Sequence, residues 1–331
     1  MIRTLVFLAT MLLGQAAAQG SDYAQRPEVQ AFIKSLAERH GFRERELARL
    51  FARVKRIEPV LAAIQLPAEK ARSWQDYRAT FLEEGRIAGG VAFWRAQRKA
   101  LERAESLYGV APEYVVAIIG VETFYGRHTG RWRVVDALTT LAFDYPPRAE
   151  FFRGELENFL LLARENGADV FSMRGSYAGA IGMPQFMPGS TRRYAVDFDG
   201  DGAIDLRRSA PDAIGSVANF LKEHGWRRGA EVLLQAQVSG EQYRQYLDGG
   251  FTPKYGVGEL TKAGVEIPGL PAELQEERGV LVELETPGAT SDFRVGLQNF
   301  YVLTRYNRSA FYATVVADLA KALRENQEPG K

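Results

Sequence analysis

A single carboxylate, Glu122, stands near the end of the apolar segment "AIIGVETFYG" at residues 117–126. On a helix, Val115, Ile118, Ile119 and Glu122 share one face, because they occupy positions i, i+3, i+4 and i+7. The carboxyl group therefore projects from an apolar face, and its desolvation is expected to raise its pKa. A carboxylic acid that stays protonated near neutral pH can give a proton to a leaving group, so Glu122 is a candidate general acid.

The helix that carries Glu122 is predicted over residues 112–125. Pro112 suits its first turn, and Gly126 suits its carboxyl-terminal cap. The structural alternative for Glu122 is an ion pair at the edge of the core. Its partner would be one of the three arginines that follow, Arg127, Arg131 and Arg133.

A second segment with the residue types of a binding loop is "GSYAGAIGMPQFMPGS" at 175–190. Its glycines let a ligand approach the backbone closely, and its aromatic rings offer flat surfaces to sugars. Ser176 and Gln185 supply uncharged hydrogen-bonding groups. The alternative is an ordinary connection that is rich in turns.

A third segment, "DFDGDGAIDLRR" at 197–208, resembles the first two thirds of a calcium-binding loop. Asp197, Asp199 and Asp201 have the spacing that directs three carboxylates at one hard cation. The twelfth position should be acidic and is Arg208, a cation that would repel the metal, unless Asp205 or Asp212 compensates. The alternatives are thus a calcium site or a structural turn of aspartate and glycine.

The segments "GVETFYG" and "GSYAGAIGMPQFMPGS" together resemble the lytic murein transglycosylase B family. Further matching motifs follow in the family's order, "LAFDYPPRAEFF", "YAVDFDGDG", "DAIGSVANFLKEHGW" and "NFYVLTRYNRSAFY". The resemblance implies a lysozyme-like catalytic domain that cleaves the β-1,4 bond between N-acetylmuramic acid and N-acetylglucosamine of peptidoglycan without water, leaving a 1,6-anhydro end. It also implies that Glu122 is the only catalytic carboxylate, first as acid and then as base toward the C6 hydroxyl of the sugar. No cofactor is required by this chemistry.

The resemblance extends to residues that contact the substrate. It implies that Ser176 hydrogen-bonds the acetamido group near the scissile bond, that Gln185 contacts a neighbouring sugar, and that Tyr77 lies along the glycan cleft. Tyr306 and Asn307 match positions that orient the catalytic site, and the alternative for them is a tyrosine-rich core.

Three further positions carry a weaker implication. Arg148 resembles a family arginine suited to the muramic lactyl or peptide carboxylate, because a guanidinium binds a carboxylate with two hydrogen bonds. Many relatives have two adjacent arginines there, whereas this chain has Pro147 before Arg148, which weakens the implied recognition of the peptide stem. Phe151 replaces a tyrosine of some relatives, and Tyr312 is a cleft candidate for which a place in the core is the favoured alternative.

The expected fold is mainly α (α+β), with a lysozyme-like catalytic domain, an additional helical subdomain and a small antiparallel β insertion. The run from Arg26 to Ile57 has helical periodicity broken at Gly41, and "EVLLQAQV" and "GVLVELET" have the residue types of strands. The predicted divisions are a signal peptide at 1–18, an N-terminal helical subdomain at 19–105, the catalytic core at 106–230, the β-containing insertion at 231–290 and a C-terminal segment returning to the cleft at 291–331.

The first twenty residues have the pattern of a secretory signal, with Arg3, an apolar stretch from Leu5 to Leu13 and small residues before a cleavage site after Ala18. The alternative, a membrane anchor, would need about 20 apolar residues, and this stretch is shorter. The chain has no cysteine, which excludes disulfides, thiol catalysis and a lipid-modified cysteine. We therefore expect a soluble periplasmic or secreted protein without a membrane anchor.

The charge balance gives no sign of a polyanion-binding protein, because 42 Lys and Arg face 41 Asp and Glu for a net charge of +1. Nucleic acid is not an expected partner. Peptidoglycan glycan strands are the expected partner, with other cell-wall enzymes as further candidates, and the chain is expected to be a monomer. The three histidines, His40, His128 and His224, lack the spacing of metal ligands, so no histidine metal site is expected.

Two other functions fit the same residues. A hydrolytic muramidase on this scaffold would need a positioned water and a second carboxylate, for which Asp136 or Asp144 is available. A catalytically silent glycan-binding protein would keep Glu122 as a structural residue only.

Overall fold

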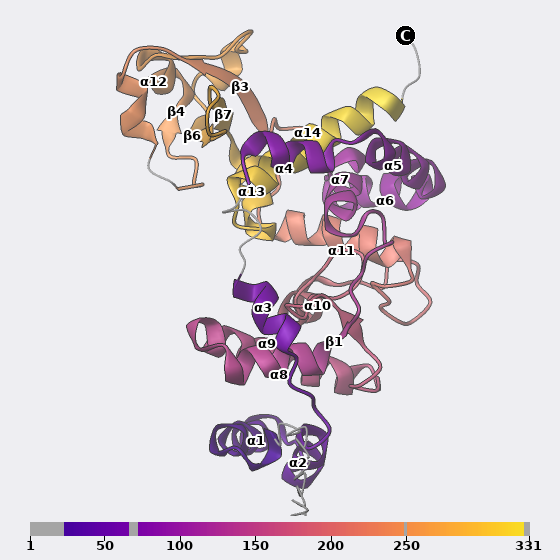
Figure 1. Ribbon diagram of the computed structural model, residues 1–331. Coiled ribbons are helices and arrows are strands. Elements are labelled where there is room, and N and C mark those ends of the chain that lie inside the picture. Colours follow the sequence, from indigo (N-terminus) through magenta and orange to yellow (C-terminus); the bar gives the residue numbers. More distant parts are fainter. Residues whose placement is uncertain (1–22, 66–71, 248–249, 328–331) are drawn as a thin grey trace, which may run out of the picture. The chain divides into compact units, whose positions relative to one another are not determined.

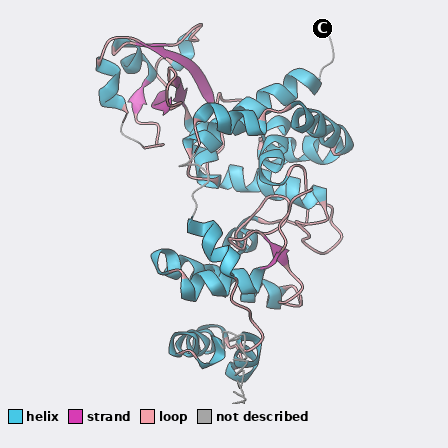
Figure 2. Ribbon diagram, in the orientation of Figure 1, coloured by secondary structure: helices cyan, strands magenta, loops and turns pink. Residues whose placement is uncertain are grey.

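The computed structural model describes residues 23–65, 72–247 and 250–327 (Figure 1). The chain divides into two compact units, Met1–Arg56 and Ile57–Lys331. The predicted signal peptide at 1–18 lies outside the described residues. The prediction of a mainly helical protein with small antiparallel sheets is confirmed (Figure 2). The subdomain boundaries remain predictions.

In its described residues, 23–56, the first unit contains a short 3-10 helix and two α-helices. These are η1 (Tyr23–Gln25), α1 (Pro27–His40) and α2 (Glu44–Phe51). Gly41 ends α1 with φ 67° and donates its N–H to Ala37 O, which confirms the predicted break. The rings of Phe32 and Phe51 meet edge to face at 6.2 Å in the small core of this unit.

The second unit contains the remaining helices of the described chain. They are α3 (Glu58–Gln65), α4 (Trp74–Phe81), α5 (Glu84–Ala96), α6 (Arg98–Tyr108), α7 (Pro112–Thr123), α8 (Val134–Asp144), η2 (Pro146–Arg148), α9 (Ala149–Glu165), α10 (Pro188–Tyr194), α11 (Ala210–Glu223), η3 (Gln242–Tyr246), α12 (Val257–Lys262), η4 (Ala272–Leu274), α13 (Gln298–Tyr306) and α14 (Ala310–Gln327). Helices α5, α6, α11 and α14 all pack against α7 (Figure 1). In a second group, helix α9 packs against both α8 and α10.

Helix α7 lies at the centre of the largest hydrophobic core. Its residues Val115 to Gly120 are all buried, and the core around them extends to α6, α11, α13 and α14. This explains why the segment is apolar on every side, because neighbours cover the whole helix. Among the described residues, no single helix is both long and apolar enough to cross a membrane, and α6 and α7 meet that criterion only as a pair bent by 115°.

The described residues of the second unit also form two antiparallel sheets (Figure 2). The strands are β1 (Trp132–Arg133), β2 (Arg174–Gly175), β3 (Leu233–Val238), β4 (Tyr255–Gly256), β5 (Val265–Glu266), β6 (Arg278–Leu284) and β7 (Asp292–Gly296). Strands β1 and β2 pair with each other, and the other five follow the order β4-β6-β7-β3-β5 around a separate apolar core. Both predicted strands, "EVLLQAQV" and "GVLVELET", are confirmed as β3 and β6.

Candidate active site

Glu122 lies in the last turn of α7 and is half-buried. Its Oε1 accepts a 2.7 Å hydrogen bond from the phenolic hydroxyl of Tyr312 in α14. Burial raises the pKa of Glu122 from an ordinary value of 4.5 to about 7, and the hydrogen bond from Tyr312 acts in the opposite direction. The carboxyl group can therefore exist both protonated and charged near neutral pH, as a proton donor that later acts as a base requires.

Two tyrosines from the C-terminal helices lie beside Glu122. The rings of Tyr306 and Tyr312 are stacked, with centroids 6.3 Å apart and an angle of 11° between their planes. Burial and the nearby Glu122 raise the pKa of both phenols well above the ordinary value. Both hydroxyls are thus neutral donors, and that of Tyr306 donates to Pro184 O at 2.6 Å in the glycine-rich segment. Tyr312 is buried, and it is also the direct partner of Glu122, which the sequence alone did not indicate.

The turn after Glu122 has an unusual backbone. Helix α7 ends at Thr123, and its cap is Phe124 with φ 51°, followed by Tyr125 with φ 60° and Gly126 with φ 85°. The prediction that the helix runs to residue 125 with Gly126 as its cap is therefore wrong. Two aromatic residues in the left-handed region are strained, and tertiary contacts must hold them there.

Arg86 and Tyr125 supply those contacts. The guanidinium of Arg86 on α5 lies over the ring of Phe124 at 4.7 Å and donates to Gly120 O of α7 at 2.5 Å. The Tyr125 hydroxyl donates to Arg86 O at 2.9 Å. A Cβ atom on Gly120 would lie 2.6 Å from that hydroxyl, so this glycine makes room for Tyr125.

These positioning residues were missed at the level of sequence. The signal that could have found them is the glycine pair Gly89–Gly90 inside α5 together with Gly120 inside α7, because a glycine within a helix often marks close packing. A Cβ on Gly90 would also meet the Tyr125 hydroxyl, at 2.4 Å. The notch for Tyr125 is thus made by two helices.

The glycine-rich segment 175–190 is joined directly to the end of α7. The Thr123 hydroxyl donates to Met183 O at 2.9 Å and accepts from Gly126 N at 3.0 Å. Thr123 therefore fixes the segment beside Glu122, although the sequence analysis did not single it out. Within the segment, Ser176 Oγ accepts the backbone N–H groups of Ala178 at 3.2 Å and Ala180 at 3.0 Å. These bonds use its lone pairs and leave its own proton available to a ligand.

Gln185 has a comparable division of roles. Its backbone is in the left-handed region, with φ 50°, and its side-chain amide nitrogen donates to Gly182 O at 2.8 Å and Thr129 O at 3.3 Å. The amide nitrogen holds the loop closed, which leaves the amide oxygen as the group that can accept from a sugar hydroxyl.

Tyr77 and Asn307 occupy different surroundings. Tyr77 on α4 is only 6% exposed and lies in an aromatic cluster with Trp74, Phe81 and Phe311, with ring centroids 5.0 to 6.5 Å from its own. Asn307 is the carboxyl-terminal cap of α13, and its side chain is exposed. Among the described residues, the Asn307 side chain has no hydrogen-bond partner.

Arg148 and Phe151 form a separate exposed pair. The Arg148 guanidinium lies 4.4 Å over the Phe151 ring and 5.2 Å from that of Phe152. Phe151 is 42% exposed. The described side-chain contacts of this pair are with each other and with Phe152. The structure therefore brings Tyr306 and Tyr312 to Glu122, with Ser176 and Gln185 on the adjoining loop.

The alternative partners of Glu122 are engaged elsewhere. Arg127 lies over the Phe124 ring and Arg131 over the Trp132 ring, while Arg133 forms a 2.6 Å ion pair with the buried Asp136. No hydrogen bond or ion pair joins Glu122 to Asp136 or Asp144, all three of which the structure describes. Within the described chain, burial and the Tyr312 hydroxyl are the influences that set the pKa of Glu122.

The aspartate-rich loop gathers a different set of carboxylates from the predicted one. Ligand oxygens of Asp197, Asp199 and Asp212 lie within 4.8 Å of one another. Asp201 is outside this group, and its carboxylate accepts the N–H of Ala203. The predicted set of Asp197, Asp199 and Asp201 is thus corrected, with Asp212 as the third member.

Comparison with known proteins agrees with this architecture. The family model of the transglycosylase SLT domain matches residues 24–321. The membrane-bound lytic murein transglycosylase B of Escherichia coli (strain K12) is 42% identical over 315 residues, which are 92% of this chain and 84% of that protein.

Solved structures show the same fold. The catenated lytic transglycosylase SltB1 from Pseudomonas aeruginosa is 46% identical with a TM-score of 0.86, over 92% of this chain and 100% of that one. The Escherichia coli lytic transglycosylase Slt35 in complex with calcium is 41% identical with a TM-score of 0.84, over 93% and 96%. SltB3 from Pseudomonas aeruginosa, in complexes with NAG-NAM-pentapeptide and NAG-anhNAM-pentapeptide, is 30% identical with a TM-score of 0.78, over 91% and 80%. The chain therefore belongs to the transglycosylase SLT domain family and is a lytic transglycosylase.

Proposed function

We propose that Glu122 is the only acid and base of the reaction, acting on the β-1,4 bond between N-acetylmuramic acid and N-acetylglucosamine. The protonated carboxyl group gives its proton to the glycosidic oxygen, and the bond from that oxygen to C1 of the muramic residue breaks. The resulting Glu122 carboxylate then takes the proton of the C6 hydroxyl of the same muramic residue. As that proton leaves, the C6 oxygen bonds to C1. The product is a 1,6-anhydro end, and the carboxyl group is protonated again.

The observation that carries this proposal is the solitary, raised-pKa carboxyl group of Glu122 beside Tyr312. A nucleophile that belongs to the substrate itself lowers the activation barrier by on the order of 7–11 kcal/mol. Because the C6 hydroxyl is that nucleophile, the reaction needs no second carboxylate to activate a water molecule. SltB3 is held in a complex with NAG-anhNAM-pentapeptide, which has the anhydro end that this reaction produces. Of the two carboxylates that the hydrolytic alternative could use, Asp136 is tied to Arg133.

Tyr312 serves both stages of the reaction. Its hydroxyl fixes one carboxyl oxygen, so that the other oxygen is presented to the glycan. Because the phenol stays neutral, it can stabilise the carboxylate that forms when the proton leaves. Tyr306 supports the same geometry by stacking on Tyr312 and bonding Pro184 O.

The remaining substrate contacts follow from groups left available beside Glu122. The Ser176 proton is assigned to the acetamido group near the scissile bond, and the Gln185 amide oxygen to a neighbouring sugar. Asn307 presents an exposed amide near Tyr306, and Tyr77 shapes the wall from behind through its aromatic cluster. Arg148 and Phe151 are assigned to a more distant part of the peptidoglycan, such as a carboxylate of the peptide stem.

The test of Glu122 is its replacement by glutamine, which keeps the shape and removes the titrating group. Glu122→Gln is expected to abolish release of soluble fragments from purified sacculi. Glu113→Gln is the matched control, because Glu113 is also a buried carboxylate of α7 with a pKa raised by burial. Sustained turnover by Glu122→Gln would sink the assignment, and equal loss in both variants would point to folding instead of chemistry.

We also infer that the acidic loop binds a calcium ion through Asp197, Asp199 and Asp212. Carboxylate oxygens are the donors that Ca²⁺ prefers, and Slt35 is a relative in complex with calcium. Arg208, at the loop's twelfth position, forms no ion pair with these three carboxylates in the described chain, and its side chain lines a pocket together with Leu206 and Arg207. The ion would brace the loop and take no part in the chemistry.

Calcium should therefore raise the melting temperature without being needed for turnover, because a ligand that binds only the folded state stabilises it. Asp199→Asn is expected to remove the calcium-dependent rise, while Asp201→Asn keeps it. If Asp201→Asn loses the calcium-dependent rise in melting temperature instead, the ion is bound by Asp197, Asp199 and Asp201, the set predicted from sequence.

The chain's location and assembly are proposed from its sequence. An exported protein cleaved after Ala18 would have Gln19 as its first residue, which mass spectrometry of the protein from the cell envelope can detect. Murein strands are the expected partner, as the comparison proteins are murein transglycosylases, and sedimentation should give a monomer.

A further inference from the structure

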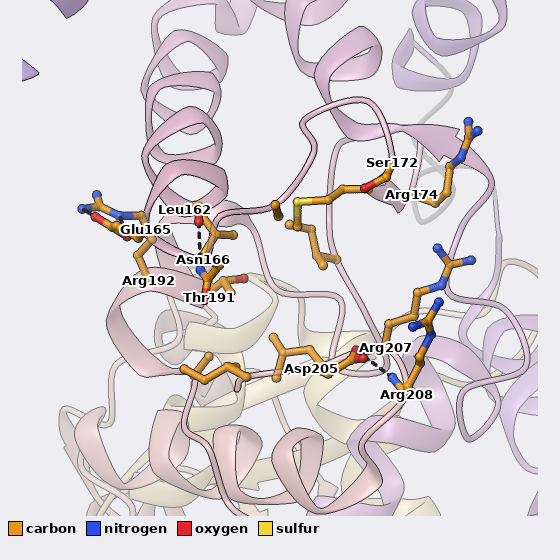
Figure 3. Close-up of a pocket in the computed structure, with 16 residues that line it drawn as sticks. Leu162, Glu165, Asn166, Ser172, Arg174, Thr191, Arg192, Asp205, Arg207 and Arg208 are labelled. Carbon is orange, nitrogen blue, oxygen red and sulfur yellow. Dashed lines mark hydrogen bonds and ion pairs between the residues drawn. The ribbon is translucent and has the colours of Figure 1, made fainter. Parts of the chain in front are cut away.

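A pocket of about 530 Å³ lies away from Glu122, between α9, α10 and the loop at 204–208 (Figure 3). It also takes in Met173 and Arg174 at β2 and Ile181 of the glycine-rich segment. None of Glu122, Ser176, Gln185, Tyr306 or Tyr312 lines it. The pocket and the candidate active site are therefore distinct, although both use the segment around residues 173–186.

Some of the charged groups that line the pocket have partners and others do not. Arg192 and Glu165 form a 2.7 Å ion pair, and Arg192 also donates to Asn158, so this cation is engaged. The carboxylate of Asp205 accepts the backbone N–H groups of Arg207 and Arg208 at 2.9 and 3.0 Å. The acidic groups in the pocket thus already have partners.

Three guanidinium groups remain available. Arg174, Arg207 and Arg208 are exposed, and within the described chain their side chains have no ion pair or hydrogen bond. Figure 3 shows all three on the same side of the pocket, opposite the Glu165–Arg192 pair. Like charges held on one wall repel one another, so this wall favours an anionic occupant.

The rest of the lining is mixed, because Asn166, Ser172 and Thr191 contribute polar groups and further residues contribute apolar ones. Leu162, Met173, Ile181, Ala195, Ile204 and Leu206 contribute side chains, and Ile204 is 41% exposed. A simple inorganic anion has no use for such a surface, whereas a short peptide has methyl groups to place on it. The combined chemistry is that of a peptide with several carboxylates.

We propose that this pocket binds the stem peptide of murein, with its carboxylates on Arg174, Arg207 and Arg208. The identity of the peptide rests on the proposed function, because murein is the substrate that carries such a peptide. Guanidinium groups hold carboxylates with paired hydrogen bonds, which gives the site both affinity and orientation. The site is separate from Arg148, whose guanidinium lies over Phe151.

The location of Arg174 connects the pocket to the glycan site. Arg174 pairs with Arg133 across β1 and β2, and Ser176 follows two residues later. A stem peptide held by Arg174 would therefore keep murein close to the loop that presents Ser176. This gives the chain a second hold on the substrate that does not depend on the sugars.

Isothermal titration calorimetry with the free stem pentapeptide tests the proposal on the whole chain. We expect R174Q/R207Q/R208Q to raise the Kd at least about tenfold relative to the unaltered protein. R45Q/R49Q/R98Q removes the same charge from exposed arginines of α2 and α6 that are also unpaired in the described chain, and it should bind as the unaltered protein does. The pentapeptide with its carboxylates amidated should lose affinity for the unaltered protein by a similar factor.

Absence of binding to the unaltered protein overturns the proposal, and so does equal affinity in all three proteins. Equal affinity for the amidated peptide also overturns it, and this arm remains decisive if the pocket variant fails to fold. Inorganic phosphate that binds the pocket and is not displaced by the peptide would reassign the site to a phosphate ligand. The titration measures binding and needs no turnover. Peptide binding can therefore be absent while Glu122→Gln still abolishes the reaction, and peptide binding can be present while Glu122→Gln stays active.

Discussion

The hydroxyl of Tyr312 is 2.7 Å from Oε1 of Glu122, and this bond joins residues 190 positions apart in the chain. It connects the start of α14 to the end of α7, so the C-terminal helices complete the site that the central helix begins. Tyr312 also fixes which carboxyl oxygen faces the protein. The pKa of Glu122 thus depends first on its own burial and then on a distant tyrosine.

Removing this hydroxyl should change both rate and pH dependence. The Tyr312 hydrogen bond lowers the pKa of Glu122, so Tyr312→Phe should raise that pKa and move the basic limb of the pH–rate profile to higher pH. The maximal rate should fall roughly 10- to 100-fold, because a hydrogen bond to a charged group contributes about 1.5–3 kcal/mol. Tyr243→Phe, in the core of the five-stranded sheet, is the control and should keep the profile. A basic limb of Tyr312→Phe that stays in place, or moves to lower pH, contradicts this role.

The raised pKa of Glu122 should also appear in stability. The folded protein binds more protons than the unfolded chain between pH 4.5 and 7, because the pKa of this group is about 7 when folded and 4.5 otherwise. This part of the free energy of unfolding is fully present below pH 4.5 and is lost as the pH rises through 7. Glutamine does not titrate, so Glu122→Gln does not lose this part of the free energy of unfolding. The free energy of unfolding of the variant minus that of the unaltered protein should therefore rise by about 2 kcal/mol between pH 5 and pH 8. Urea unfolding at the two pH values measures it, and parallel profiles would show that Glu122 has an ordinary pKa.

Arg86 is expected to position the end of α7. Arg86→Gln removes the cation over the Phe124 ring, and the shorter side chain no longer reaches Gly120 O. The strained turn at Phe124 and Tyr125 then loses the contacts that hold it. We expect the rate constant for turnover to fall while KM changes little, with a loss of about 1–3 kcal/mol of stability. Arg86→Lys keeps the charge and should recover part of the rate. A selective rise in KM would place Arg86 in substrate binding instead.

The notch around Tyr125 gives a test of packing. Gly120→Ala would put a Cβ atom 2.6 Å from the Tyr125 hydroxyl and 2.7 Å from its ring, so it should lower the free energy of unfolding by about 1–3 kcal/mol. Gly85→Ala is the matched control in α5, where a Cβ meets nothing within 4 Å. It should stabilise the protein by about 0.5–1 kcal/mol, because alanine is the better helix former. Chemical denaturation compares the two, and equal effects would show that the notch is not tight.

The fold and the central residue were within reach of sequence because they depend on local patterns. The break at Gly41, the strands β3 and β6, and the cap of α14 at Ser309, whose hydroxyl accepts from Tyr312 N at 3.1 Å, all follow from local residue types. Burial of Glu122 followed from the apolar face of a single helix. These features need no knowledge of what packs against them.

The errors arise where packing between distant segments decides. Helix α7 ends at Thr123 because Tyr125 fits a notch that Gly90 of α5 and Gly120 share, which no local signal for Gly126 can show. Tyr312 was favoured as a core residue, and its burial hides the fact that its hydroxyl reaches Glu122. Asp212 joins the acidic cluster from α11 in place of Asp201, whereas the sequence suggested Asp212 only as a residue that could compensate for Arg208.

The most direct test of the central claim is mass spectrometry of purified peptidoglycan digested in water enriched in ¹⁸O. If the C6 hydroxyl is the nucleophile and Glu122 the only acid and base, the new muramic ends are anhydro ends, lighter by one water than reducing ends, and contain no ¹⁸O. Glu122→Gln should yield none of them, while Glu113→Gln yields the same product as the unaltered protein. Reducing ends that carry ¹⁸O would contradict the account, because water would then be the nucleophile.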